Sequence, residues 1–386
     1  MSENNKIYLD NASTTQTDQR VIETMLPYFN ENYGNASSLH QFGTTAKDQI
    51  QTARKQIADY IKCNVDELIF TASGTEANNF ALKGIAFANQ TKGNHIIVSS
   101  IEHDCILNTC KWLEKQGFVI SYLPVDAQGL INTDTLKRYL TPQTILVSIM
   151  HVNNEIGTIQ PIDEIGKICK ENKVYFHSDA CQSFGKIPID IRHVDLLTIN
   201  AHKIYGPKGV GALYIKKEVN INPLLHGGGQ EFGLRSSTEN TPGIVGFAKA
   251  TELCFNEMEK ENKRIKFLQQ KLITALSETI EGIYFNGDLT KRIPHNINFC
   301  IGGLEGESIR LLLLLDEEGI AVSSGSACSS NGDNPASHVL QAIGLNPFEA
   351  RGSVRISLGR YTTEKDIDTF SNAFQKIIRQ LKPIFS

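Results

Sequence analysis

The segment at residues 174–203, VYFHSDACQSFGKIPIDIRHVDLLTINAHK, holds two short apolar runs, each followed by a residue that can take part in chemistry. The first run, at residues 174–178, leads into Asp179, and the second, at 196–199, is followed by Lys203. Short runs of this composition predict buried strands. Ligands of open α/β sheets gather at the carboxyl ends of the strands, so the segment predicts an α/β fold with a site beyond these two strand ends.

The same type of run recurs on both sides of this segment. Strands are predicted at residues 68–70, 96–98, 118–123, 145–149, 174–176, 196–199 and 210–215. Stretches with helical spacing precede or separate several of them, at residues 50–61, 75–84, 105–116 and 162–171. This alternation predicts a large, mostly parallel seven-stranded sheet, and its last two strands are close enough in sequence to admit an antiparallel member.

The pattern changes after Gly243. A long helix at residues 247–278 is followed by a strand at 297–300 and by helices at 307–318 and 364–381. This order predicts a smaller α+β C-terminal domain. We therefore divide the chain into a large domain at residues 12–255 and a small domain made of residues 1–11 and 256–386.

Composition and charge are those of an ordinary globular protein. Of the 386 residues, 40% are hydrophobic and 21% are charged, and 38 basic against 42 acidic residues give a net charge of -4. Charges of one sign form no long block, so neither direct nucleic-acid binding nor an anionic membrane surface is indicated. The first residues contain no apolar stretch and the longest aliphatic run is residues 311–315, so we expect a cytoplasmic protein.

The eight cysteines are scattered and include no C-x-x-C pair, which argues against a disulfide framework. His103, Cys105 and Cys110 could form part of a metal site, but no fourth ligand follows at a familiar spacing. We expect no metal.

The end of the first predicted strand offers a place for a phosphate group. Gly74 and Thr75 lie in the sequence TASGTE, where a strand passes into a helix whose first N–H groups are free. An ordinary N-cap with a glycine turn is the alternative. Combined with Asp179 and Lys203, however, the segment suggests pyridoxal phosphate, whose aldehyde forms a Schiff base with a lysine and whose ring nitrogen is kept protonated by a carboxylate.

A run of small residues, SSGSACSS at 323–330, surrounds Cys328. Such residues bury little apolar area, so we expect an exposed, mobile loop with a reactive thiol. A polar surface loop in which the cysteine is incidental is the alternative.

The order of several motifs resembles that of the cysteine desulfurases of the NifS/IscS type, which belong to the class-V aminotransferases. The motifs are YLDNASTT at residue 8, SGTE at 73, HVNNEIG at 151, HSDACQ at 177, HKIYGPKG at 202 and HGGG at 226. The likeness extends to RYTT at residue 360, and the Cys328 loop resembles that of the group I members. The resemblance implies the fold type I of pyridoxal-phosphate-dependent transferases.

The resemblance also implies a role for each site residue. Lys203 would bind the cofactor, Asp179 its ring nitrogen, Gln182 its phenolate oxygen, and His103 would stack on its ring and move protons. The residues placed where the family binds phosphate are Gly74, Thr75, Asn200, His202 and, from the other subunit of a homodimer, Thr238. Arg355, assisted by Asn154, would hold the substrate carboxylate, because a guanidinium group matches a carboxylate with two hydrogen bonds.

Four positions qualify this picture. Asn200 and Ser237 stand where serine and glycine are common in the family, so their phosphate contacts must differ in geometry. Cys181 is interpreted as a small side chain buried in the core. For Arg355 the alternative is a strand-edge arginine paired with a surface acid.

The implied reaction converts L-cysteine to L-alanine and leaves the sulfur on Cys328 as a persulfide. Its acceptor would be a tRNA-thiolating enzyme or an iron–sulfur scaffold, and the short sequence after RYTT favours the former because longer members dock the scaffold with a tail. The alternatives are a selenocysteine lyase or aminotransferase-like enzyme, an esterase-like hydrolase with HGGG as oxyanion hole, and a non-catalytic sulfur carrier. No G-x-S-x-G motif supports the hydrolase.

Overall fold

The computed structural model describes residues 6–324 and 336–385. A seven-stranded sheet has the strand order β2-β8-β7-β6-β5-β3-β4. In that order the strands are Leu68–Thr71, Gly211–Ile215, Leu196–Asn200, Tyr175–Asp179, Thr144–Ser148, His95–Ser99 and Val119–Leu123. Strand β8 is antiparallel to both of its neighbours, and the remaining neighbours in this sheet pair in parallel. The predicted mostly parallel sheet with one late antiparallel strand is confirmed.

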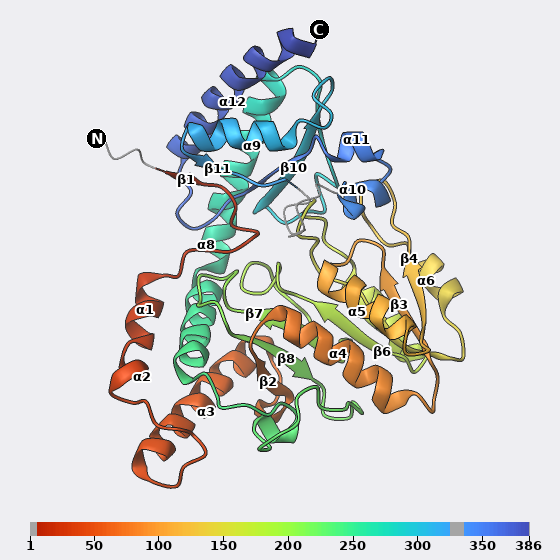
Figure 1. The fold of residues 1–386 in the computed structure, drawn as a ribbon, viewed down its shortest axis with the longest axis vertical. Helices are drawn as coiled ribbons and strands as arrows, with labels where there is room; N and C mark the ends of the chain where they lie inside the picture. The colour runs from red at the N-terminus through yellow and green to blue at the C-terminus, as the bar shows by residue number, and fades with distance from the viewer. Residues whose placement is uncertain (1–5, 325–335, 386) are drawn as a thin grey trace.

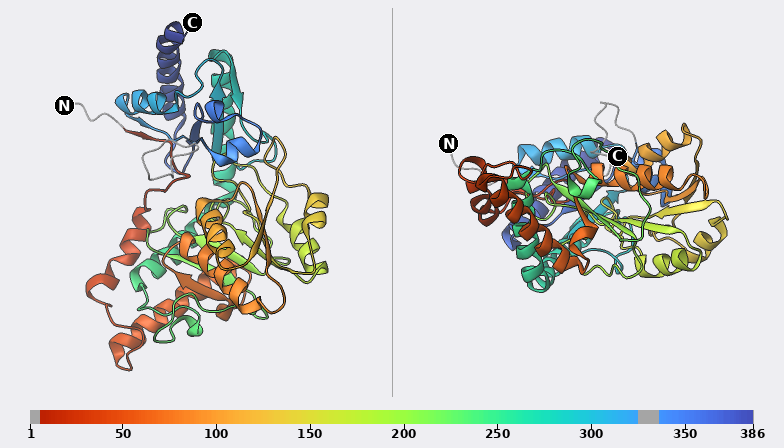
Figure 2. Two further views of the ribbon diagram at one scale, coloured as in Figure 1. Left: turned by 45° about the vertical axis from the view of Figure 1, so that its right-hand side comes forward. Right: turned by 90° about the horizontal axis from the view of Figure 1, so that it is seen from below.

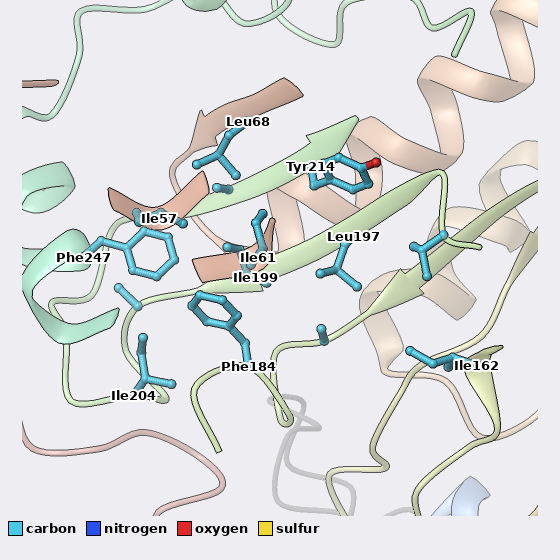
Figure 3. Packing of buried hydrophobic residues seen from close by; sticks show 14 of the residues in the cluster. Ile57, Ile61, Leu68, Ile162, Phe184, Leu197, Ile199, Ile204, Tyr214 and Phe247 are labelled. Carbon is cyan, nitrogen blue, oxygen red and sulfur yellow. The ribbon is translucent and has the colours of Figure 1, made fainter. Parts of the chain in front are cut away.

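Helices cover both faces of this sheet (Figure 1). They are α3 (Gln41–Ile61), α4 (Gly74–Asn89), α5 (Asp104–Glu114), α6 (Thr133–Tyr139) and α7 (Ile162–Glu171). Alternate strand residues face opposite ways: Leu197 and Ile199 pack with α3 and α7, whereas Leu196 packs with α4 and α5. Figure 3 shows the first of these layers, in which Phe184 and Phe247 pack beside Ile199. Helices therefore pack against both faces of the sheet and shield them from solvent.

A second core builds the smaller C-terminal domain. Its antiparallel sheet has the order β12-β10-β9 (Val354–Ser357, Asn296–Ile301, Ile283–Phe285), and β1 (Ile7–Tyr8) pairs with β11 (Ile320–Ala321). Helices α9 (Ser308–Glu317) and α12 (Glu364–Phe385) cover it. The short elements are α1 (Gln19–Met25), α2 (Pro27–Asn30), α10 (His338–Ala342), α11 (Pro347–Ala350) and 3-10 turns at Val65–Glu67 and Glu231–Gly233.

Helix α8 (Thr241–Thr279) connects the two cores without a break (Figure 2). It starts six residues before the predicted residue 247, because Asn240 caps it by accepting the Gly243 N–H and Pro242 is tolerated in the first turn. The proposed boundary between residues 255 and 256 lies inside this helix and stays a prediction. Among the described residues, no helix combines the length and apolar character needed to cross a membrane.

A buried ion pair fastens the loop before α8 to the sheet. The Arg54 guanidinium donates to both Glu231 carboxylate oxygens at 2.6 and 2.7 Å and to the Leu68 carbonyl at 2.6 Å. Glu231 also accepts the Phe70 N–H at 2.7 Å, although its backbone has a φ of 49°. These bonds hold the loop against β2, the strand that leads to the first turn of α4.

We expect Arg54→Leu to lower the free energy of unfolding by about 3–5 kcal/mol, because it leaves the Glu231 carboxylate buried without its partner. Urea titration would measure the change. Lys55→Leu is the matched control: Lys55 pairs with Asp59 on the exposed side of the same helix, and such pairs contribute about 0.5 kcal/mol or less. Equal losses in the two variants would contradict a structural role for the buried pair.

Candidate active site

A cavity of about 190 Å³ lies at the carboxyl ends of β6 and β7, beside the first turn of α4. Its lining residues run from Ala12 to Arg355 and so come from distant parts of the sequence. Nine of the predicted site residues line it: Gly74, Thr75, His103, Asn154, Asp179, Asn200, His202, Lys203 and Arg355.

The first turn of α4 forms one wall of the cavity. Ser73 caps the helix by accepting the Glu76 N–H at 3.1 Å, and the N–H groups of the first turn have no partner inside the helix. A Cβ atom on Gly74 would lie 2.7 Å from the Cys181 sulfur and 3.5 Å from the Asn200 amide nitrogen. Only glycine therefore leaves this wall open. Cys181 is buried, as predicted, but it borders the cavity rather than the core, which corrects that interpretation.

Asp179 is held as a charged acceptor. Burial on its own would raise the pKa of this carboxyl group. The Cys181 N–H and the Asn78 amide, which donate to it at 2.8 and 2.7 Å, and the charge of Lys203 outweigh that effect and lower the pKa. Asp179 therefore stays ionised and can accept a hydrogen bond from a protonated ring nitrogen.

His103 caps helix α5, and its Nδ1 accepts the Cys105 N–H at 3.1 Å. Burial, followed by the charge of Lys203, lowers the pKa of His103. The ring is thus neutral at pH 7. Because Nδ1 is an acceptor, Nε2 carries the proton and acts as a donor.

Arg355 is buried between the two domains and borders the cavity. One terminal nitrogen, Nη2, donates to Asp10 at 2.9 Å and to Ser13 at 2.7 Å, while Nη1 donates to the Asn154 carbonyl at 3.1 Å. Its Nε is buried and has no acceptor among residues 6–324 and 336–385. Arg355 does pair with an acid, as the alternative interpretation required, yet it keeps an unused donor.

His202 and Lys203 lie in the turn after β7. The His202 Nδ1 lies 3.1 Å from the Thr14 hydroxyl, and the His202 carbonyl accepts the Thr15 N–H at 2.9 Å. Burial and then the charge of Lys203 lower the pKa of His202 to about 4. Two segments distant in sequence thus fix the backbone next to Lys203.

Three predicted residues do not line this cavity. Gln182 borders a neighbouring cavity that shares Ala12 with it, and Thr238 borders a third cavity beside Arg235. The Thr238 side chain is exposed, and the cavity it borders is not lined by Gly74, Thr75, Asn200 or His202. Cys328 lies outside the described residues.

Both flanks of the segment that carries Cys328 are attached beside the cavity. Ser323 exchanges two backbone hydrogen bonds with Arg355, at 2.6 and 3.1 Å. The Ser337 hydroxyl donates to the buried Glu155 carboxylate at 2.5 Å. The segment therefore leaves and rejoins the described structure next to the site.

Sequence reasoning missed Asn78 and Cys105 in the cavity wall. The Asn78 amide donates to Asp179 and also lies 3.2 Å from the Cys105 sulfur. An asparagine on the apolar face of α4 was a signal that could have been used. Burial raises the pKa of the Cys105 thiol to about 12, so this pocket thiol is protonated.

Comparison with known proteins gives a consistent result along the chain. The family described as aminotransferase class-V matches residues 7–370. A cysteine desulfurase IscS from Clostridium botulinum is 50% identical over 381 residues, which cover 98% of this chain and 95% of the relative. The structure of a NifS-like protein has a TM-score of 0.91 at 38% identity, covering 97% of this chain and 100% of the other. The structure of SspA in complex with cysteine has a TM-score of 0.82 at 38% identity, covering 92% and 100%.

Proposed function

Since the chain belongs to the class-V aminotransferase family and is similar to cysteine desulfurases over nearly their whole length, we propose that it is a pyridoxal-phosphate-dependent cysteine desulfurase. It would convert L-cysteine to L-alanine and transfer the sulfur to Cys328. The observation that supports this most is that nine residues selected from the sequence line one cavity, with Asp179 and Lys203 among them. The family assignment leaves no support for the esterase-like alternative.

The cavity fits pyridoxal phosphate in its donors and its space. The first turn of α4 and the missing Cβ of Gly74 provide N–H groups and room for a phosphate. The Asn200 amide oxygen is buried without a partner among the described residues, so the amide can turn its N–H₂ toward a phosphate without breaking a bond to that oxygen. Lys203 would hold the aldehyde end and Asp179 the ring nitrogen. Once bound, the cofactor withdraws electrons from the substrate Cα through its protonated ring.

The protein groups around the cofactor have separate tasks. The freed Lys203 amine moves the proton of the substrate Cα. His103 donates a hydrogen bond from Nε2 toward the cofactor ring. Its Nδ1 can accept a proton only if the hydrogen bond from the Cys105 N–H breaks. Arg355 would orient the substrate carboxylate with the N–H groups that Asp10 and Ser13 leave free, since these two residues occupy Nη2 whereas Nη1 donates, among the described residues, only to the Asn154 carbonyl. The relative at 38% identity whose structure holds cysteine supports L-cysteine as the substrate.

The test of this function is direct. The purified protein should absorb visible light, lose that absorption on borohydride reduction, and form alanine and a protein persulfide in equal amounts from L-cysteine. A colourless protein after incubation with pyridoxal phosphate would leave a non-catalytic carrier as the better explanation. Alanine without a protein persulfide, the sulfur being released as sulfide at the expense of an added dithiol reductant, would favour a lyase.

Gly74→Ala should weaken the binding of pyridoxal phosphate by about tenfold or more, because the new methyl group lies 2.7 Å from the Cys181 sulfur and narrows the phosphate wall. Equilibrium titration of the apoenzyme would give the dissociation constant. The double variant with Cys181→Ala removes that contact and should recover part of the affinity. Unchanged affinity in Gly74→Ala would place the phosphate elsewhere.

Asn200→Ser should change cofactor retention by less than about tenfold, since a single neutral hydrogen bond contributes about 1 kcal/mol. Serine is the residue common at this position in the family, and it cannot leave a buried amide oxygen without a partner. Dialysis against cofactor-free buffer, followed by measurement of bound cofactor, checks this. A large loss would show that Asn200 has another role.

We also propose that the enzyme acts as a homodimer in which Thr238 reaches the partner's phosphate. Large apolar side chains are exposed between the end of α1 and the first turn of α3: Leu26, Phe29, Tyr33, Leu39 and Phe42. These elements project at one end of the molecule (Figure 1), and a monomer gains nothing from exposing such a surface. Sedimentation should give twice the chain mass, and Thr238→Val should release cofactor faster.

The sulfur acceptor is proposed to be a tRNA-thiolating enzyme, with an iron–sulfur scaffold as the rival. Persulfide exchange needs only an accessible Cys328 and an ionised acceptor thiol, so a small transient interface suffices. Enzyme labelled with ³⁵S-cysteine should transfer label to the tRNA-modifying enzyme. Labelling of the scaffold alone would reject this acceptor and leave the desulfurase assignment intact.

A further inference from the structure

Lys186, a lysine buried close to the cofactor site, takes no part in the steps proposed for the reaction. Its side chain is 8% exposed and borders the cavity that contains Gln182 and His295. It makes no ion pair with a described residue, since no carboxylate lies within salt-bridge distance of its Nζ. A buried amine without a carboxylate is costly to keep charged, so its presence calls for a partner of another kind.

That partner is Gln182, four residues earlier in the turns that follow β6. The Lys186 Nζ donates to the Gln182 Oε1 at 3.4 Å, and the Gln182 Nε2 donates to the Ala12 carbonyl at 2.9 Å. The two bonds decide which way the Gln182 amide faces, with its oxygen toward Lys186 and its nitrogen toward Ala12. Ala12 also borders the cavity with Lys203, so the Gln182 nitrogen is bonded to a residue that the two cavities share.

We propose that Lys186 is a positioning residue, which fixes the oxygen of the Gln182 amide so that its second N–H is free to donate to the phenolate oxygen of pyridoxal phosphate. Without Lys186 only the bond to the Ala12 carbonyl opposes a flip of the amide. A flipped amide would place its oxygen opposite the phenolate, which repels it. This inference rests on the proposed function and assigns a residue that acts through Gln182.

The electrostatic surroundings agree with this role. Burial, followed by the charge of Lys203, lowers the pKa of Lys186 to about 7. The other titratable groups that act on it are Cys254 and Cys181, and Lys186 in turn acts on His202 and His295. None of these is a carboxylate. A neutral amine still donates one hydrogen bond, so the contact with Gln182 persists above neutral pH.

The experiment compares Lys186→Met, Gln182→Met and the double variant as holoenzymes. The visible absorption of the bound cofactor changes with pH because the cofactor loses a proton and becomes more negative. The midpoint is the pH at which half of the cofactor has lost this proton. A nearby hydrogen-bond donor or positive charge stabilises the more negative form and lowers the midpoint. Both single variants should raise it, Lys186→Met by about half to one pH unit. The double variant should match Gln182→Met, because a residue that acts through Gln182 has no further effect once Gln182 is gone. Lys208→Met, which removes an exposed lysine from the Lys203 loop, should shift the midpoint by less than about 0.2 unit.

A midpoint equal to the wild-type value in Lys186→Met, or shifts that add in the double variant, would overturn the inference. Far-ultraviolet circular dichroism and cofactor stoichiometry establish that the variants are folded, and Lys186→Leu provides the same comparison should the methionine variant not fold. The rate of cofactor release in dialysis is a second readout and should rise together with the midpoint. Wild-type protein without visible absorption would instead defeat the proposed function.

Discussion

Lys203→Ala should abolish the covalent attachment of pyridoxal phosphate and lower the rate of alanine formation at least about 10³-fold. The substitution removes both the amine that holds the cofactor and the base that moves the Cα proton, and a positioned acid–base group alone contributes about 10²–10⁴-fold. Lys203 borders the cavity together with Asp179 and His103. Borohydride treatment followed by mass spectrometry would show whether any lysine carries the cofactor.

The structure changes which lysine is the proper control for that result. From the sequence, Lys208 is the nearest competitor, but its side chain is exposed and does not border the cavity. Lys186 is buried in the neighbouring cavity and is bonded to Gln182, so it is the alternative attachment point. A borohydride-stable adduct that persists in Lys203→Ala and disappears in Lys186→Ala would refute the assignment of Lys203.

The strands of the large sheet were predictable from composition, whereas several strands of the small domain were not. Strands β2, β3, β5, β7 and β8 coincide with runs of apolar, often β-branched residues, because strands covered on both faces need them at most positions. Strand β12, although it has four residues, was not predicted. Strands β1 and β11 have two residues each, which is too short for any periodicity. Their pairing across 313 positions (Ile7 to Ile320) depends on the tertiary fold alone.

Some residues of the candidate site could be predicted from the sequence, and some of its contacts could not. Residues that follow a strand, such as Asp179 and Lys203, were predictable because strand ends meet at one edge of the sheet. The ion pair between Asp10 and Arg355 was not, since it joins positions 345 residues apart and neither lies in a pattern that points to the other. The contact of Asn78 with Asp179 was missed because α4 reads as an apolar helix facing the sheet.

Two cysteines line the cavity, Cys105 and Cys181, and either could in principle take the substrate sulfur in place of Cys328. Burial, and then the charge of Asp179, raises the pKa of Cys105 to about 12 and also raises that of Cys181. A thiol with a pKa of about 12 is ionised in only about one molecule in 10⁵ at pH 7. Since the thiolate is the nucleophile, neither pocket cysteine can replace a more accessible thiol.

Cys328→Ala should therefore keep the visible absorption of the bound cofactor while lowering persulfide formation at least about 10²-fold. Ser323 and Ser337, which flank its segment, are bonded to Arg355 and Glu155, and Arg355 borders the cavity. Gel-resolved ³⁵S label from L-cysteine, compared with alanine release, measures the two steps separately. Cys105→Ala is the matched control and should still form the persulfide, because its protonated thiol does not attack. Alanine and sulfide released by Cys328→Ala at the wild-type rate would mean that no enzyme thiol takes part, and the selenocysteine-lyase type of reaction would then describe this chain better than the desulfurase one.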